Sequence, residues 1–189
     1  CQLLCDLLPN EAEVFGLLAL IALSVARAKG RVDAQGELVR LSEQNRTLWD
    51  PATIKEGLLA LQRARRLGRG SYVLQAEISA CHATAPTWDD TEWKRILGYY
   101  DELLRLSPSP VVALNRAVAV CMYAGAAAGL AELTSLETAL ANYHLFYAVR
   151  ADFRQRLGQD ALADYQRALE LASNESERRF LRRKIDEVR

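Results

Sequence analysis

Residues 160–172 read DALADYQRALELA, and this stretch decides the fold class. Ala161, Tyr165 and Ala168 lie four and three residues apart, so a helix places them on one face. Small side chains on that face let a second helix approach closely, and the aromatic ring fills the gap to the next pair. A helix of this length is marginal in water by itself and gains its stability from packing. The stretch therefore predicts a packed helix in an all-α domain.

The same spacing recurs earlier in the chain. The sets are Gly57/Leu61/Ala64, Ile96/Tyr100/Leu103 and the weaker Leu130/Thr134/Glu137, where Glu137 stands in place of a small residue. The sets that begin at Ile96 and Leu130 lie 34 residues apart, which is the period of tetratricopeptide repeats. This recurrence predicts antiparallel helix pairs stacked as a tetratricopeptide-like solenoid.

Proline, glycine and capping residues mark the expected helix ends. Pro51 and Pro110 follow Asp50 and Ser109 at helix starts, and Asp89 is expected to open another helix. Capping boxes are expected at Asn10 with Glu13 and at Asn174 with Glu177, and glycines 30, 68, 125 and 158 close helices. These signals predict about nine helices joined by short turns, which makes neighbours antiparallel. We expect a single helical repeat domain over 1–189, with a first helix in 1–30, an ordered loop with a small hairpin in 31–49 and repeat helices in 50–189.

The composition argues against a nucleic-acid-binding domain, a disulfide-stabilised domain and a membrane-spanning protein. Lys and Arg number 24, as do Asp and Glu, whereas a chain that binds nucleic acid by itself usually carries excess positive charge. Four scattered cysteines favour a reducing cytoplasm over a disulfide framework. The longest uncharged apolar run, Val14–Ala26, is too short to span a membrane and is interpreted as a buried helix.

Catalytic patterns are missing from the sequence. It contains no phosphate-binding loop, no Gly-x-Ser-x-Gly motif and only two histidines, His82 and His144, so we expect neither an enzyme nor a cofactor. A metal could be held by Cys81 and His82 with Cys121, or by Cys1 with Cys5. Neither arrangement has the paired spacing of zinc sites, so we interpret these cysteines as buried thiols and expect no metal.

Polar residues inside apolar helices are the candidate binding groups. Asn115 and Arg116 interrupt VVALNRAVAV on the type of helix that lines the groove of such solenoids, and Arg150 with Asp152 are similarly placed in YAVRADF. An internal Arg–carboxylate pair is an equally open interpretation, because buried polar groups must be paired in either case. RRFLRRK at 178–184 is interpreted as the solvated face of a capping helix rather than a nucleic-acid contact. The candidate partner-binding residues are Trp49, Asp50, Gln75, His82, Asn115, Arg116, Arg150 and Asp152.

Several segments carry a family resemblance. EAEVFGLLALIAL, RVDAQGELVRLSEQNRTLWD, YVLQAEISACHA, SPSPVVALNRAVAV and NESERRFLRRKI closely resemble the C-terminal extension of a group of bacterial extracytoplasmic-function sigma factors. The resemblance spans essentially the whole chain in the same order. In that family a tetratricopeptide-like extension follows two helical domains that bind core RNA polymerase and the promoter. Asn45 departs from the pattern, since an acidic residue is expected beside Arg46.

The resemblance implies a regulatory role in transcription initiation. It implies sigma core domains upstream of Cys1, and as partners those domains, RNA polymerase holoenzyme and a regulatory protein. Promoter DNA would be reached only through the upstream domains, in the cytoplasm and away from any membrane. Two other interpretations stay open: a generic tetratricopeptide-type adaptor for a peptide or partner protein, and a small-molecule-sensing domain or weak enzyme using the region of Trp49, Asn115 and Arg116.

Overall fold

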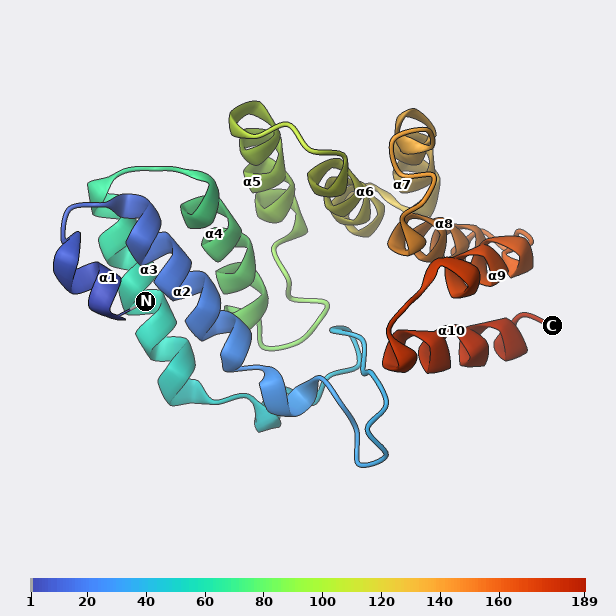
Figure 1. Cartoon of the computed structure of the whole chain (residues 1–189), viewed down its shortest axis with the longest axis horizontal. Coiled ribbons are helices and arrows are strands. Elements are labelled where there is room, and N and C mark those ends of the chain that lie inside the picture. The colour runs from blue at the N-terminus through green and yellow to red at the C-terminus, as the bar shows by residue number, and fades with distance from the viewer. Residues whose placement is uncertain (1) are drawn as a thin grey trace. The chain divides into compact units, whose positions relative to one another are not determined.

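The computed structural model describes residues 2–189, so Cys1 lies outside the described residues. The described chain is all-α (Figure 1). Its α-helices are α1 Gln2–Leu7, α2 Ala12–Val25, α3 Pro51–Leu67, α4 Ser71–Thr84, α5 Trp93–Leu106, α6 Pro110–Ala124, α7 Ala126–Leu133, α8 His144–Arg156, α9 Leu162–Leu171 and α10 Glu175–Glu187. Three 3₁₀ turns join them: η1 Ala28–Gly30, η2 Arg46–Leu48 and η3 Thr134–Leu136. The all-α prediction and the packing in helix pairs are confirmed.

The helices fall into two compact units. Unit 1 contains α1 to α5 within residues 2–33 and 39–108, and unit 2 contains residues 34–38 with α6 to α10 in 109–189. The prediction of one domain over 1–189 stays a prediction.

Unit 1 is built on the antiparallel pair α2 and α3. The guanidinium of Arg63 on α3 lies 4.4 Å from the ring centroid of Phe15 near the start of α2. Further along, a Cβ at Gly57 would lie 2.9 Å from Cγ of Leu23, so a larger residue at position 57 would force the Leu23 side chain or the helices to shift. Gly57, Leu61 and Ala64 are buried, as their spacing predicts. Helix α4 packs on α2, and α5 packs on α4.

Glu13 stabilises a helix other than its own. The prediction of a capping box with Asn10 is wrong, because α2 begins at Ala12 after Glu11, which makes no side-chain cap. The Glu13 carboxylate instead accepts hydrogen bonds from the backbone N–H groups of Tyr72, at 2.9 Å, and Val73, at 3.2 Å. These are unpaired donors of the first turn of α4, where a negative charge also meets the positive end of the helix dipole. Glu13 therefore stabilises the packing of α4 against α2.

Unit 2 contains the pairs α6 with α7 and α8 with α9, followed by α10 on α9. Tyr165 is 1 % exposed and packs in a core with Ala161 and Ala168, which confirms their predicted burial. The Tyr165 hydroxyl donates to Oε1 of Gln155 on α8 at 3.0 Å. Leu181 and Ile185 of α10 complete this core. Several charged residues of α10 pair within the helix, such as Arg182 with Glu175, as the interpretation of a capping helix requires. Others reach further: Arg178 donates to the carbonyls of Leu169 and Ala172, and Arg179 pairs with Glu37.

Some helix boundaries differ from their predicted positions. Asp50 and Asn174 cap α3 and α10 as expected. Asp89 is expected with Glu92 to open the next helix, but α5 begins at Trp93 directly after Glu92, and Asp89 does not cap it. Residues 89 and 90 form a turn instead, and Asp90 accepts hydrogen bonds from the backbone N–H and hydroxyl of Thr87. The described residues form ten α-helices instead of about nine, since the short α1 adds one.

The loop between α2 and α3 contains the small hairpin that its turn residues suggest. Val39 N–H donates to the carbonyl of Arg31 at 2.9 Å, and Gly36 at the turn has a φ of +76°, which favours glycine. Among the described residues, no helix is long and apolar enough to cross a bilayer.

Candidate functional site

The main polar site of unit 1 lies where η2 meets the end of α4. Nη1 of Arg46 donates to the carbonyl oxygens of His82, at 2.6 Å, and Ala85, at 2.8 Å. Carbonyls at a helix C-terminus lack partners within the helix, and a cation there also meets the negative end of the dipole. One nitrogen of Arg46 therefore caps α4. Asn45 accepts from Thr47 N–H at 3.0 Å, so the residue that departs from the family pattern caps η2 instead.

Two arginines share one tryptophan. The guanidinium carbon of Arg46 lies 4.5 Å from the centroid of the Trp49 ring, and that of Arg27 lies 5.8 Å from it. Trp49 itself is 5 % exposed. An aromatic face attracts a cation, and the attraction grows when the pair is shielded from water. Trp49 thus holds two positive charges near one another.

Aromatic rings cover the same region from the side of α4 and α5. The His82 ring stacks with Trp88, with 6.3 Å between centroids, and meets Trp93 edge-on at 5.3 Å. Trp88 and Trp93 meet edge-on at 4.8 Å. Together with Trp49 these are the three tryptophans of the chain. We call Arg27, Arg46, Trp49, His82, Trp88 and Trp93 the Arg–Trp–His cluster.

The cluster is a partly desolvated positive site, in which Arg27 and His82 are more buried than Arg46. Burial, reinforced by the charges of Arg27 and Arg46, lowers the pKa of His82 to about 4, so the imidazole is neutral at pH 7. Burial is also the main cause that lowers the pKa of Arg27, followed by repulsion from Arg31 and Arg46. For Arg46, burial lowers the pKa while the charge of Asp90 opposes the shift.

Several buried polar atoms of the cluster lack a hydrogen-bonding partner among the described residues. They are Nε of Arg27, Nη2 of Arg46, Nε1 of Trp49 and Nδ1 of His82. Most buried polar atoms in folded proteins are paired, so four unpaired atoms in one cluster are unusual.

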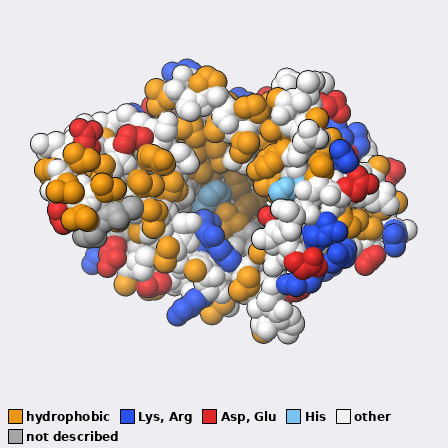
Figure 2. All heavy atoms as spheres, in the orientation of Figure 1, with side chains coloured by type: hydrophobic (Ala, Val, Ile, Leu, Met, Phe, Trp, Pro, Cys, Tyr) orange, Lys and Arg blue, Asp and Glu red, His pale blue; other side chains and the backbone are white. Residues whose placement is uncertain are grey.

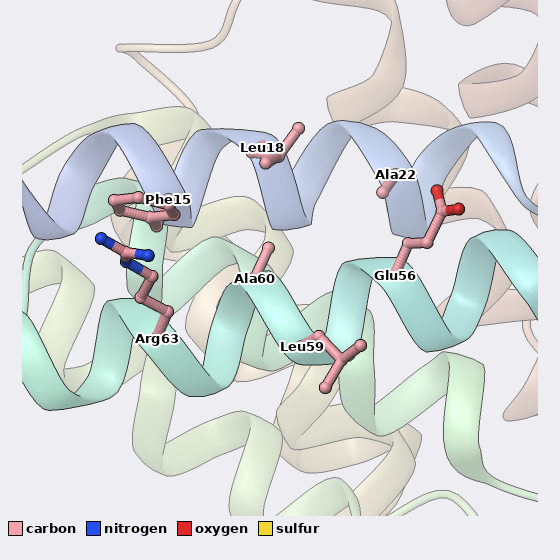
Figure 3. Close-up of a pocket in the computed structure, with 7 residues that line it drawn as sticks. All are labelled: Phe15, Leu18, Ala22, Glu56, Leu59, Ala60 and Arg63. Atoms are coloured by element: carbon pink, nitrogen blue, oxygen red, sulfur yellow. The ribbon is translucent and has the colours of Figure 1, made fainter. Parts of the chain in front are cut away.

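An apolar groove lies between α2 and α3 in the same unit. Figure 3 shows Phe15 and Arg63 at one end and Ala22 and Glu56 at the other. The groove has a volume of about 440 Å³ and is lined by Phe15, Leu18, Ala22, Glu56, Leu59, Ala60 and Arg63. Its Leu59 is 57 % exposed. An apolar floor with opposite charges at its two ends suits a helix or peptide segment.

A second exposed apolar surface lies on α1. Leu3 and Leu7 lie one helical turn apart and are 71 % and 66 % exposed. Figure 2 shows hydrophobic side chains gathered over α1 and α2. Exposed apolar patches of this kind often mark interaction sites.

The structure brings together part of the residue set proposed from sequence. Trp49 and His82 meet in the Arg–Trp–His cluster. Asp50 lies next to Trp49, but its carboxylate accepts from Ala52 N–H and the Thr53 hydroxyl, and so caps α3. Gln75 lies on α4 two turns before His82 and donates to the carbonyl of Ser71 within its own helix.

The other proposed residues belong to unit 2, where the arginines are paired internally. Nη1 of Arg116 on α6 donates to Glu132 on α7 at 2.5 Å. Arg150 on α8 contacts Asp164 on α9 at 2.7 Å and Glu137 at 2.8 Å. These pairs are what the structural interpretation requires, and a partner contact through either arginine stays a prediction.

Asn115 and Asp152 complete the set from unit 2. Asn115 is exposed on α6, and Asp152 pairs with Arg156 one turn along α8 at 2.7 Å. The proposed grouping of Trp49 with Asn115 and Arg116 combines residues of two different units, so neither unit by itself contains it.

Sequence reasoning missed Arg27, Arg46, Trp88 and Trp93 as site residues. The available signal was compositional: two of the three tryptophans fall within residues 88–93, and the third follows Arg46 closely. Among the described residues, no group of three or more His, Cys, Asp or Glu could hold a metal ion. Cys81 is buried, and this burial raises the pKa of its thiol to about 11.

Comparisons with known proteins identify relatives without a described activity. Residues 1–65 match the model of a family described as "Family of unknown function (DUF6596)". The chain is 40% identical over 190 aligned positions to "Uncharacterized protein R00370" of Rhizobium meliloti (strain 1021). That alignment covers 99% of this chain and 45% of the relative, so the chain spans about half the length of the curated protein it matches. No solved structure matches the chain.

Proposed function

We propose that the chain is the regulatory C-terminal part of an alternative, extracytoplasmic-function sigma factor. It acts by binding protein, in the cytoplasm, and catalyses no reaction of its own. The resemblance of the whole sequence to such extensions supports this assignment. The relative in Rhizobium meliloti, of which the alignment covers 45%, is long enough to contain further domains. The equal numbers of acidic and basic residues fit a part that leaves DNA and polymerase contacts to other domains.

The groove of α2 and α3 is the observation that carries the proposal. It offers apolar surface for an interface core, with Glu56 and Arg63 at its ends for orientation. We propose that its occupant is a helix of the sigma core domains of the same protein. Leu3 and Leu7 of α1 offer further exposed apolar surface in the same unit. Docking of the sigma core domains on this surface would control whether those domains can bind polymerase and promoter.

A charge placed in the groove tests the proposal in the full-length protein. We expect Leu59→Lys to reduce transcription from a sigma-dependent promoter by roughly tenfold or more, since a desolvated charge opposes docking. Leu106→Lys is the matched control, because Leu106 is 55 % exposed and lies on α5, outside the groove. Circular dichroism checks that both variants keep their helices.

Each outcome has a clear meaning. Loss of transcription in Leu59→Lys alone supports the docked-core proposal. Equal transcription in both variants and the wild type would show that the groove is not the regulatory contact. Absence of any sigma-dependent transcription by the full-length wild type would favour the adaptor interpretation instead.

A further inference from the structure

We propose that the Arg–Trp–His cluster of unit 1 is a binding site for a small oxyanion, meaning a carboxylate or phosphate group. The proposal concerns residues outside the groove of α2 and α3 and stands independently of the sigma-factor assignment.

The unpaired polar atoms of the cluster indicate which kind of ligand would bind there. A buried donor without a partner is destabilising, and more so when it belongs to a charged group. Nε of Arg27, Nη2 of Arg46 and Nε1 of Trp49 are three such atoms, and each can only donate. The group that satisfies them must therefore present acceptors. An oxyanion offers several acceptor oxygens at once.

The positive charges of Arg27 and Arg46 also favour an oxyanion. Among the described residues, no carboxylate forms an ion pair with Arg27 or Arg46, whereas most other arginines of the chain have one, such as Arg65 with Glu77. Asp90 is the acidic residue whose charge reaches Arg46, and its carboxylate is engaged by Thr87. Two guanidiniums near one indole thus leave local positive charge that an anion would neutralise, in the planar geometry that suits carboxylate and phosphate.

The aromatic walls strengthen this interaction. Trp88 and Trp93 pack around His82, and Trp49 is almost fully buried. Shielding from water lowers the effective dielectric constant, so a charge pair inside the cluster is stronger than one at the surface. His82, neutral at pH 7, adds a ring nitrogen at Nδ1 without a further charge.

A purely structural role explains only part of the cluster. As a cap for α4, Arg46 uses Nη1 on the carbonyls of His82 and Ala85. That role leaves Nη2 of Arg46 and Nε of Arg27 without a partner among the described residues. An oxyanion accounts for these remaining donors and leaves the cap in place.

Tryptophan fluorescence is a specific reporter, because the three tryptophans of the chain all lie in the cluster. The purified chain is titrated with inorganic phosphate in one arm and with succinate in another, against sodium chloride at equal ionic strength. We expect a saturable fluorescence change and a rise in melting temperature with at least one of the two, and neither with chloride. The arm that responds identifies the class of oxyanion.

Arg27→Gln is the site variant and Arg66→Gln the control. Both remove one positive charge, but Arg66 is exposed on α3. We expect Arg27→Gln to weaken binding by roughly tenfold or more, and Arg66→Gln to leave it unchanged. If Arg27→Gln fails to fold, Arg27→Lys, which keeps the charge but loses the planar donor set, should also weaken binding. No saturable response to phosphate or succinate in the wild type, or an equal response in the site variants, overturns the proposal.

Discussion

Replacing Arg150 by alanine should destabilise unit 2 far more than the same change at Arg116. Asp164 has a side chain that is only 4% exposed, and Arg150 contacts both of its oxygens through Nε at 3.1 Å and one of them through Nη2 at 2.7 Å. Arg154 contacts the second oxygen at 2.7 Å. The Arg150 guanidinium also lies 5.1 Å from the Phe146 ring.

The expected loss of stability depends on how buried the carboxylate is that loses its arginine partner. Removing one partner of a buried ion pair costs about 3–5 kcal/mol, because the other charge stays desolvated. Arg154 keeps one contact with Asp164, so we expect a loss of roughly 2–3 kcal/mol for Arg150→Ala. Glu132, the partner of Arg116, has a side chain that is 41% exposed and can be solvated. For Arg116→Ala we therefore expect a loss of about 0–1 kcal/mol.

Urea denaturation followed by far-ultraviolet circular dichroism measures this difference. Tryptophan fluorescence does not follow unit 2, since the three tryptophans lie in unit 1. With a urea slope of about 1–3 kcal/mol per molar, the Arg150→Ala midpoint should fall by roughly 0.7–3 M relative to wild type. Equal midpoints for Arg150→Ala and Arg116→Ala would refute the reasoning that Asp164 depends on Arg150.

Two further predictions concern the core and the dependence of stability on pH. Tyr165→Ala should lower the free energy of unfolding by roughly 3 kcal/mol or more, because Tyr165 is 1 % exposed. Tyr100→Ala should lower it by less, because Tyr100 is half-buried, and equal urea midpoints for the two variants would contradict this ranking. The pKa of His82 is lowered to about 4 in the folded chain from about 6.5 when unfolded, so the unfolded state binds more protons between these values and stability falls as pH falls through that window. Between pH 7 and pH 5 the free energy of unfolding should fall by about 2 kcal/mol, as measured by tryptophan fluorescence, and His82→Asn should remove most of this pH dependence. The same pH dependence in both proteins would exclude His82 as its source.

Local chemistry explains why much of the fold is predictable from sequence. Asp50, Asn174, Pro51 and Pro110 act within one helical turn, so they mark helix starts whatever the tertiary context. The spacing of Ala161, Tyr165 and Ala168 identifies a buried helix face in the same way. All-α class and helix pairing follow from such short-range rules.

Tertiary structure decided the residues whose partners are distant in sequence. Glu13 resembles a local cap, but its carboxylate binds the start of α4, 59 and 60 residues away. Arg46 binds carbonyls 36 and 39 residues away, and only folding brings Arg27 and Arg46 to the same ring, that of Trp49. A helix signal depends on neighbours a few residues apart, whereas a side chain on a helix end can reach any element packed against it. The sequence by itself therefore determined the helices and their buried faces, and the packing of α2, η2 and α4 determined the candidate site.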